Sequence, residues 1–248
     1  ERQGMRRVRR QGICRRMVHG GTTPQGLSLV DLREEMGLEG LEAMTLRAEV
    51  RERVERFPAL GAVVLEVFRL TGNPDCNTGE VGEVLASDAA LAARVLRLAN
   101  SAYYGLPRRV ESVSLAVSLL GLRAVRRLTL SVVTYDLMQA ELDGYGYREG
   151  ALWAHSLGAS VAAEYLCRKF GYRKEEEVRL MALLHDVGKI VVSPFLVATM
   201  NEADAQKFAD GGSSGCDRER ELCGMDHAQA GAMIAEHWRL SSRFQEVI

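Results

Sequence analysis

Apolar positions recur at helical spacing along almost the whole chain after residue 28. Between residues 59 and 71 they repeat every three or four residues, at Leu60, Val63, Val64, Val67 and Leu70. This spacing places apolar side chains on one face of a helix, whereas strands need an alternation that is scarce in this chain. The pattern therefore predicts an all-α fold.

Capping residues and helix breakers divide the pattern into separate helices. Ser28, Asp88 and Ser112 are suited to begin helices, whereas Gly37 and Gly121 are suited to end them. We expect helices near residues 28–36, 45–56, 59–71, 78–86, 88–100, 112–121, 122–138, 151–169, 175–190, 194–208 and 226–239. Residues 211–215 are glycine- and serine-rich and predict a flexible loop.

Glycines and polar residues at 143–150 mark the internal boundary that the sequence favours. They separate an N-terminal helical subdomain over 46–142 from a C-terminal helical subdomain over 143–248. Residues 1–45 contain a basic tail and a lead-in helix, which we interpret as a linker or a remnant. The chain begins at Glu1 rather than Met, which indicates a piece of a longer protein or a trimmed product.

Composition and charge narrow the class of protein. The 248 residues are 47% hydrophobic, enough for a sizeable core, and we find no apolar stretch close to the ~18–20 residues of a membrane span. The net charge is −1, but residues 1–20 hold seven arginines and one acid, so the rest of the chain is acidic. This balance argues against nucleic-acid binding. Five cysteines without a CxxC pair favour a reducing, cytoplasmic compartment.

Three side chains carry the candidate chemistry: His155, His185 and Asp186. Small and apolar residues recur around His155 at helical spacing, which predicts that its imidazole points inward. His185 and Asp186 end the apolar run 180–184, so two polar side chains are expected in an apolar setting. Such burial costs several kcal/mol unless a partner is present. We expect the three groups to converge.

A divalent metal is one such partner. Imidazole nitrogens and a carboxylate suit iron, manganese, zinc or nickel, with magnesium a further candidate, and they leave positions open for water or substrate. The other interpretation is that the polar groups satisfy one another inside the core without a metal. The sequence leaves both open.

The same residues carry a family resemblance. Segments 153–157 (WAHSL) and 182–189 (ALLHDVGK) resemble the HD superfamily of metal-dependent phosphohydrolases. Segments 57–60, 87–105, 114–122 and 225–232, with Trp238, resemble the HDOD domain, the HD-related output domain of bacterial signalling proteins. The resemblance runs from about residue 48 to the end of the chain.

The resemblance implies an N-terminal helical bundle packed against an HD-like bundle. It also implies a regulatory, non-catalytic module of signal transduction that acts through signalling protein partners, with a pocket for a metal or a small ligand such as a nucleotide. The alternative is a metal-dependent phosphohydrolase acting on a nucleotide or cyclic dinucleotide. His155, His185 and Asp186 match the first three HD metal ligands, His227 resembles a further histidine, and Lys189 matches a lysine that would be catalytic only in an enzyme. No residue clearly matches the final HD aspartate.

The remaining polar signals have structural interpretations. Asp226 and Gln229 have the spacing of a capping box, which places His227 on the first turn of a helix. Asn100 is suited to cap a helix or to bond to the next loop. Five arginines flank the hairpin over 112–138, and we interpret them as a solvated face: Arg108, Arg109, Arg123, Arg126 and Arg127.

Overall fold

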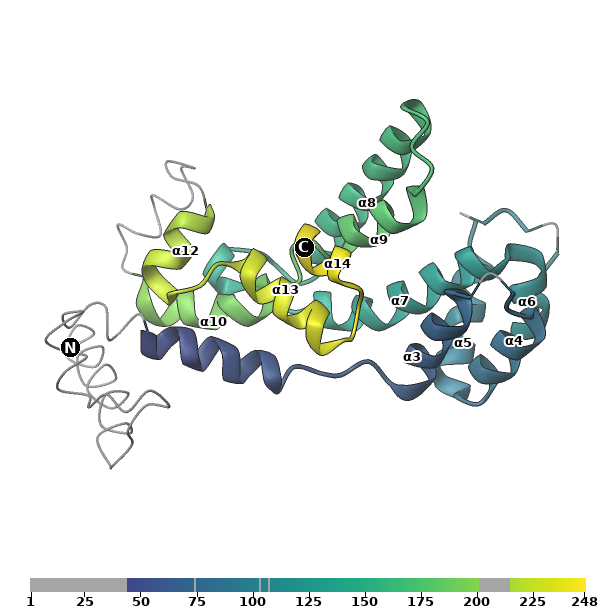
Figure 1. The fold of residues 1–248 in the computed structure, drawn as a ribbon, viewed down its shortest axis with the longest axis horizontal. Helices are drawn as coiled ribbons and strands as arrows, with labels where there is room; N and C mark the ends of the chain where they lie inside the picture. The colour runs from purple at the N-terminus through teal and green to yellow at the C-terminus, as the bar shows by residue number, and fades with distance from the viewer. Residues whose placement is uncertain (1–43, 74, 103, 107, 201–214) are drawn as a thin grey trace, which may run out of the picture.

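Helices form the computed structural model of the chain, which describes residues 44–248 except 74, 103, 107 and 201–214 (Figure 1). Among the described residues there is no β-strand, and only an isolated antiparallel bridge joins Leu142 to Tyr147. The predicted all-α fold is therefore confirmed. The expected helix over 28–36 lies outside the described residues.

The first half of the chain forms a cluster of short helices around one longer helix. These are α3 (Ala62–Thr71), α4 (Thr78–Ala86), α5 (Ala89–Ala99), α6 (Val113–Leu120) and α7 (Leu122–Met138). Side-chain caps begin three of them: Asn77 before α4, Asp88 before α5 and Ser112 before α6. Gly121 adopts a φ of 80° between α6 and α7, a backbone conformation that favours glycine.

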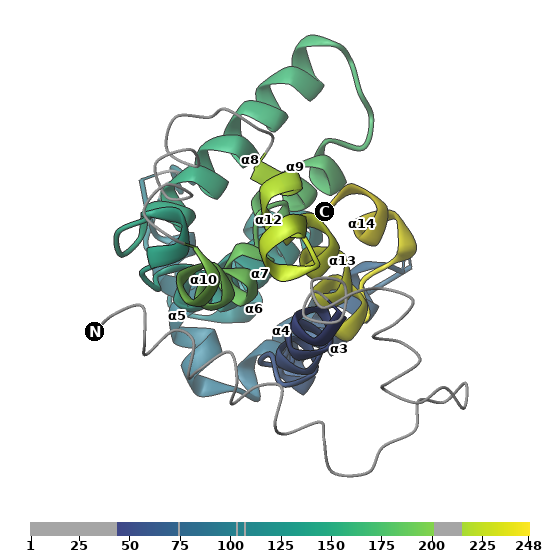
Figure 2. The same cartoon turned by 90° about the vertical axis from the view of Figure 1, so that its left-hand side faces the viewer.

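The second half packs around the other end of α7. It comprises the 3₁₀ turn η1 (Asp143–Tyr145) and helices α8 (Ala151–Lys169), α9 (Glu175–Leu184), α10 (Lys189–Thr199), α12 (Gly215–Cys223), α13 (His227–His237) and α14 (Ser242–Val247). Helices α8 and α9 pack along each other and project from the body, as Figures 1 and 2 both show. The capping box of Asp226 and Gln229 begins α13, as the sequence predicts.

Residues 44–58 lie against the second half, although sequence order puts them before the first. A helix over 44–55 buries Val50 and Val54. The Phe57 ring lies 5.8 Å from that of Trp238, whose indole N–H donates to the Pro58 carbonyl over 2.8 Å. Through these contacts, the start of the described chain packs against the end of α13. The subdomain boundary drawn near residue 143 stays a prediction.

Two predicted helices begin or end at the wrong residue. The helix expected over 175–190 ends at Leu184, and residues 185–188 form a turn before α10 begins at Lys189. The helix expected from residue 194 therefore starts five residues earlier and contains Pro194. The apolar pattern continues across the turn, so spacing alone does not reveal the break. Helices α12 and α14 were not predicted.

The expectation that no apolar stretch could span a membrane needs correction. Glu175–Thr199 is a 25-residue helical stretch that is long and apolar enough to do so. Its most apolar window is 61% buried inside the protein, and it contains the turn with His185 and Asp186. Core packing therefore accounts for its hydropathy.

Candidate functional site

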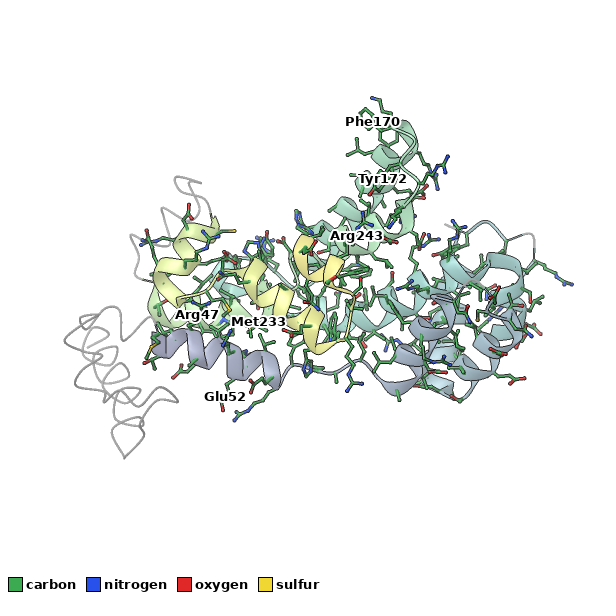
Figure 3. The ribbon with its side chains drawn as sticks, in the orientation of Figure 1. Arg47, Glu52, Phe170, Tyr172, Met233 and Arg243 are labelled. Atoms are coloured by element: carbon green, nitrogen blue, oxygen red, sulfur yellow. The ribbon has the colours of Figure 1, made fainter. Side chains whose placement is uncertain are left out.

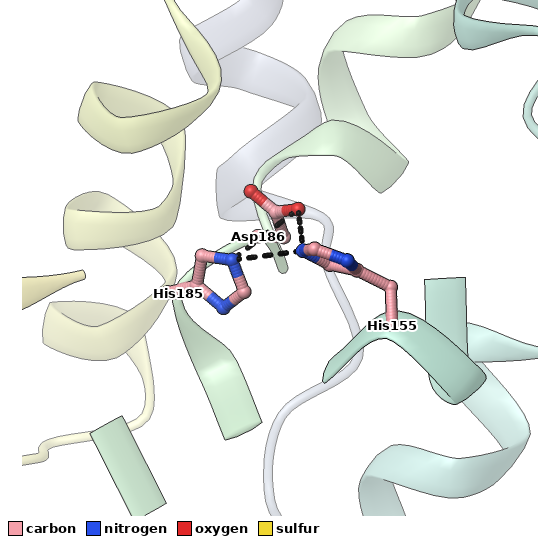
Figure 4. A group of neighbouring side chains, drawn as sticks. All are labelled: His155, His185 and Asp186. Carbon is pink, nitrogen blue, oxygen red and sulfur yellow. Dashed lines mark hydrogen bonds and ion pairs between the residues drawn. The ribbon is translucent and has the colours of Figure 1, made fainter. Parts of the chain in front are cut away.

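His155 on α8 meets His185 and Asp186 on the turn between α9 and α10 (Figure 4). The His155 Nε2 atom lies 3.2 Å from His185 Nε2 and 3.3 Å from Asp186 Oδ2. His185 Nε2 lies 3.5 Å from the same carboxylate oxygen. The structure thus brings together the three residues that the sequence singled out.

Hydrogen bonding fixes what one of these nitrogens can do. His185 Nδ1 lies 2.8 Å from the Ala182 carbonyl oxygen, so Nδ1 donates a proton there and Nε2 is the ring nitrogen that faces His155 and Asp186. Ligand atoms bound about 2.0–2.2 Å from a metal, at angles near 90–110°, lie roughly 3.0–3.5 Å apart. The donor set of two imidazoles and a carboxylate therefore fits a divalent metal in chemistry and in spacing.

Asp186 also has two cationic neighbours. Lys189 Nζ donates to Oδ2 over 2.6 Å, and His227 Nε2 lies 3.3 Å from Oδ1. Burial opposes ionisation of Asp186, but the hydrogen bonds from His227 and Lys189 outweigh it and hold the pKa of the carboxyl well below its usual range. The side chain is only 3% exposed, so the carboxylate is a buried charge neutralised by the protein.

Glu219 on α12 completes this network. Its carboxylate is 1% exposed, accepts a 2.9 Å hydrogen bond from the Tyr145 hydroxyl and lies 2.8 Å from His227 Nδ1. Burial alone would lower the pKa of His227, but its hydrogen bonds to Asp186 and Glu219 raise that pKa to about 9. His227 is therefore a cation at neutral pH, bridging two buried carboxylates.

Sequence reasoning missed Glu219. It lies in the strongly charged segment 217–221, which has no apolar run to mark a buried face. Only Cys223, one helical turn later, indicates that this side of α12 faces the core.

Cys216, Glu219 and His227 form a second group whose potential metal-ligand atoms lie within 4.8 Å of one another. Cys76, Cys167, Cys216 and Cys223 are all free thiols.

The environment of His155 differs from the prediction. Its side chain is 50% exposed rather than directed into the core, so it lies at the open edge of the site. The buried positions of α8 are Leu152, Ser156, Ser160, Glu164 and Cys167. Because α8 has small and apolar residues on both sides, its sequence does not show which side packs.

Three other candidate residues have structural roles. Asn100 donates to the Leu96 and Val110 carbonyls and accepts from the Val110 N–H, which confirms both of its expected contacts. The solvated face predicted for the hairpin arginines is wrong at two positions. Arg126 lies over the Phe68 ring at 4.7 Å, and Arg127 forms a 2.8 Å ion pair with Glu176.

One family model matches most of the chain. The family model of the HDOD domain matches residues 57–248. An uncharacterized protein of Treponema pallidum (strain Nichols) is 27% identical over 209 residues, which are 79% of this chain and 37% of the relative. The chain therefore spans little more than a third of that relative's length.

Solved structures with the same fold come from several bacteria. An HDOD domain protein of unknown function from Geobacter sulfurreducens has a TM-score of 0.67 and 27% identity, covering 82% of this chain and 67% of its own. A protein from Shewanella amazonensis whose name proposes a phosphohydrolase has a TM-score of 0.62 and 25% identity, covering 81% and 70%. A protein from Marinobacter aquaeolei, named as a candidate in signal transduction, has a TM-score of 0.61 and 23% identity, covering 82% and 49%, and supports the fold alone.

Proposed function

Because this chain belongs to the HDOD domain family, we propose that it is a regulatory output module of bacterial signal transduction that binds protein partners rather than hydrolysing a substrate. A cytoplasmic location remains part of this proposal.

One observation carries the proposal: the Asp186 carboxylate is already neutralised by side chains of the protein. Lys189 Nζ contacts Oδ2 at 2.6 Å, and the cationic His227 faces Oδ1 at 3.3 Å. Glu219 in turn balances His227. The two buried carboxylates are therefore balanced by two cationic side chains. The fold does not need an added ion to compensate the charge of Asp186.

A metal-dependent phosphohydrolase is the second candidate. It is favoured by the convergence of His155 Nε2, His185 Nε2 and Asp186 Oδ2, whose spacing suits a metal. These three residues would hold the ion, which would supply a Lewis acid and a source of hydroxide. Lys189 would then bind a phosphate oxygen, and His227 would orient Asp186. The similarity to the Shewanella protein named as a phosphohydrolase also supports it.

Hydrolysis that depends on the site separates the two candidates. The purified chain is analysed for metals and assayed with bis(p-nitrophenyl) phosphate in the presence of Mn²⁺, Fe²⁺, Zn²⁺, Ni²⁺ or Mg²⁺. The regulatory proposal predicts no turnover that depends on His185. Robust metal-dependent turnover that His185→Ala abolishes would establish the phosphohydrolase instead. His237→Ala is the matched control, because His237 bonds to the Phe57 carbonyl at 3.0 Å, outside the site.

A further inference from the structure

Helix α8 buries three polar side chains and leaves several large apolar side chains exposed. Ser156, Ser160 and Glu164 are buried, and Glu164 bonds to Arg168 and Arg179. The exposed side also holds His155, Arg168 and Lys169. Its apolar and small residues, here called the α8 face, are Ala154, Leu157, Gly158, Val161, Ala162, Tyr165 and Leu166. Its four large side chains are 41–63% exposed. A helix that buries serines and exposes such a face is typical of a surface that another molecule covers.

The face leads into a hollow at its base. A cavity of about 680 Å³ lies between α8 and helices α5 and α7, with Leu157 and Val161 on one wall. Tyr135 and Trp153 line it too, with their rings 5.1 Å apart and edge to face. Its volume is large enough to receive an aromatic side chain. At the other end, Phe170 is 76% exposed at the tip of the projecting arm, where Figure 3 also shows Tyr172.

The charge around the face is unbalanced toward the positive. Each nearby acid already has a basic partner: Asp136 pairs with Arg94, Glu164 and Glu175 with Arg168, Glu176 with Arg127, and Glu177 with Lys174 and Arg243. Arg97, which lines the cavity, and Arg173, at the tip, are exposed and form no ion pair within the described part of the chain. A ligand that covers the face therefore meets an unpaired cation at each end.

We propose that the α8 face and its cavity bind an amphipathic helix of a partner protein, with an aromatic side chain in the cavity and acidic residues at both ends. The helical stretch 154–169 is about 24 Å long, which matches four to five turns of a partner helix. This inference rests on the proposed regulatory function and names the chemistry of the partner.

Charge and shape favour a protein helix over two other occupants. A second copy packed antiparallel on α8 would bring Arg173 of one chain near Arg97 of the other, which is repulsive. An anionic membrane surface is typically bound by clusters of four to eight basic residues and would leave the cavity unfilled. An acidic helix satisfies both arginines and fills the cavity.

The test selects binders from a displayed library of 18-residue amphipathic helices, in which the end charges and one anchor position vary. We expect the enriched peptides to carry acidic ends and an aromatic anchor, and to change the fluorescence of Trp153. Val161→Asp should weaken their binding tenfold or more. Val197→Asp on α10 is the matched control, since Val161 and Val197 are 46% and 50% exposed. Arg97→Glu should shift the preference toward peptides with basic ends.

Several results would overturn the inference. These are no enrichment over the Val161→Asp protein, enrichment of peptides with no preference for acidic ends, or equal loss of binding in both valine variants. Dimerisation that Val161→Asp abolishes would assign the face to a second copy. Val161-dependent binding to phosphatidylglycerol vesicles, without peptide binding, would assign it to a membrane. Phosphodiester turnover would refute the proposed regulatory function without affecting any of these readouts.

Discussion

Replacing Lys189 with methionine tests the idea that this lysine serves as the counter-ion of the site. The change keeps an unbranched side chain of similar length but removes the ammonium 2.6 Å from Asp186 Oδ2. The side chains of Lys189 and Asp186 are 13% and 3% exposed, so the carboxylate would lose its closest cation while remaining buried.

The expected cost follows from that burial. Removing one partner of a buried ion pair costs about 3–5 kcal/mol, and His227 still faces the other carboxylate oxygen, so we expect the low end, about 3 kcal/mol. The same substitution should raise the affinity of the site for a metal, because it removes a nearby positive charge. A divalent ion on Asp186 Oδ2 would lie about 4 Å from the ammonium, where a dielectric constant near 20 gives a repulsion of roughly 8 kcal/mol before Lys189 moves.

Urea unfolding followed by circular dichroism measures both effects. In chelator, Lys189→Met should lower the midpoint by about 1.5 M, taking a slope near 2 kcal/mol/M. Zinc or manganese at a hundred times its dissociation constant should restore about 2.7 kcal/mol. Lys169→Met is the matched control, because Lys169 is exposed at the end of α8. A variant as stable as the wild type in chelator, with unchanged metal affinity, would refute the reasoning.

Three further predictions concern the packing and charge of the same half of the molecule. The pKa of His227 in the folded protein is raised to about 9. Its contribution to the free energy of unfolding is therefore complete below pH 6.5 and is lost as the pH rises through 9. The free energy of unfolding in chelator should fall by about 2–3 kcal/mol between pH 6.5 and 10, and His227→Gln should flatten this profile. Gly188→Ala would place Cβ 1.9 Å from the His227 carbonyl oxygen, so urea unfolding should show a loss of about 3 kcal/mol or more in the free energy of unfolding. Gly158→Ala is the control, because its Cβ would have no atom within 4 Å and should not destabilise the protein. Trp238→Ala should cost about 3–5 kcal/mol and expose residues 44–58 to limited proteolysis; resistance equal to the wild type would contradict the docking of that segment.

Helix existence was predictable where the signals are local. The caps at Asp88 and Ser112 and the glycine at 121 act within a few residues, and α5, α6 and α7 begin at or within a residue of the expected positions. The turn at 185–188 was not predictable in this way. Gly188 is held against the backbone of α13, a contact between residues distant in sequence.

The residues of the candidate site also differ in whether local sequence could predict them. His155, His185 and Asp186 were identified because polar residues in a small and apolar setting are unusual, and they do converge. The sequence pattern could not identify Glu219, because its burial depends on His227 and Tyr145, which contact it from other elements. The exposure of His155 was misjudged because only tertiary packing decides which side of α8 is covered.

Nuclear magnetic resonance of the histidine ring nitrogens tests the convergence of the site most directly. In chelator-treated protein at pH 7, we predict that His185 Nδ1 carries a proton, which it donates to the Ala182 carbonyl, and that His227 is protonated on both nitrogens. Added Zn²⁺ should shift the Nε2 signals of His155 and His185 together and leave His237 unchanged. A neutral His227, or independent responses of His155 and His185, would contradict the account.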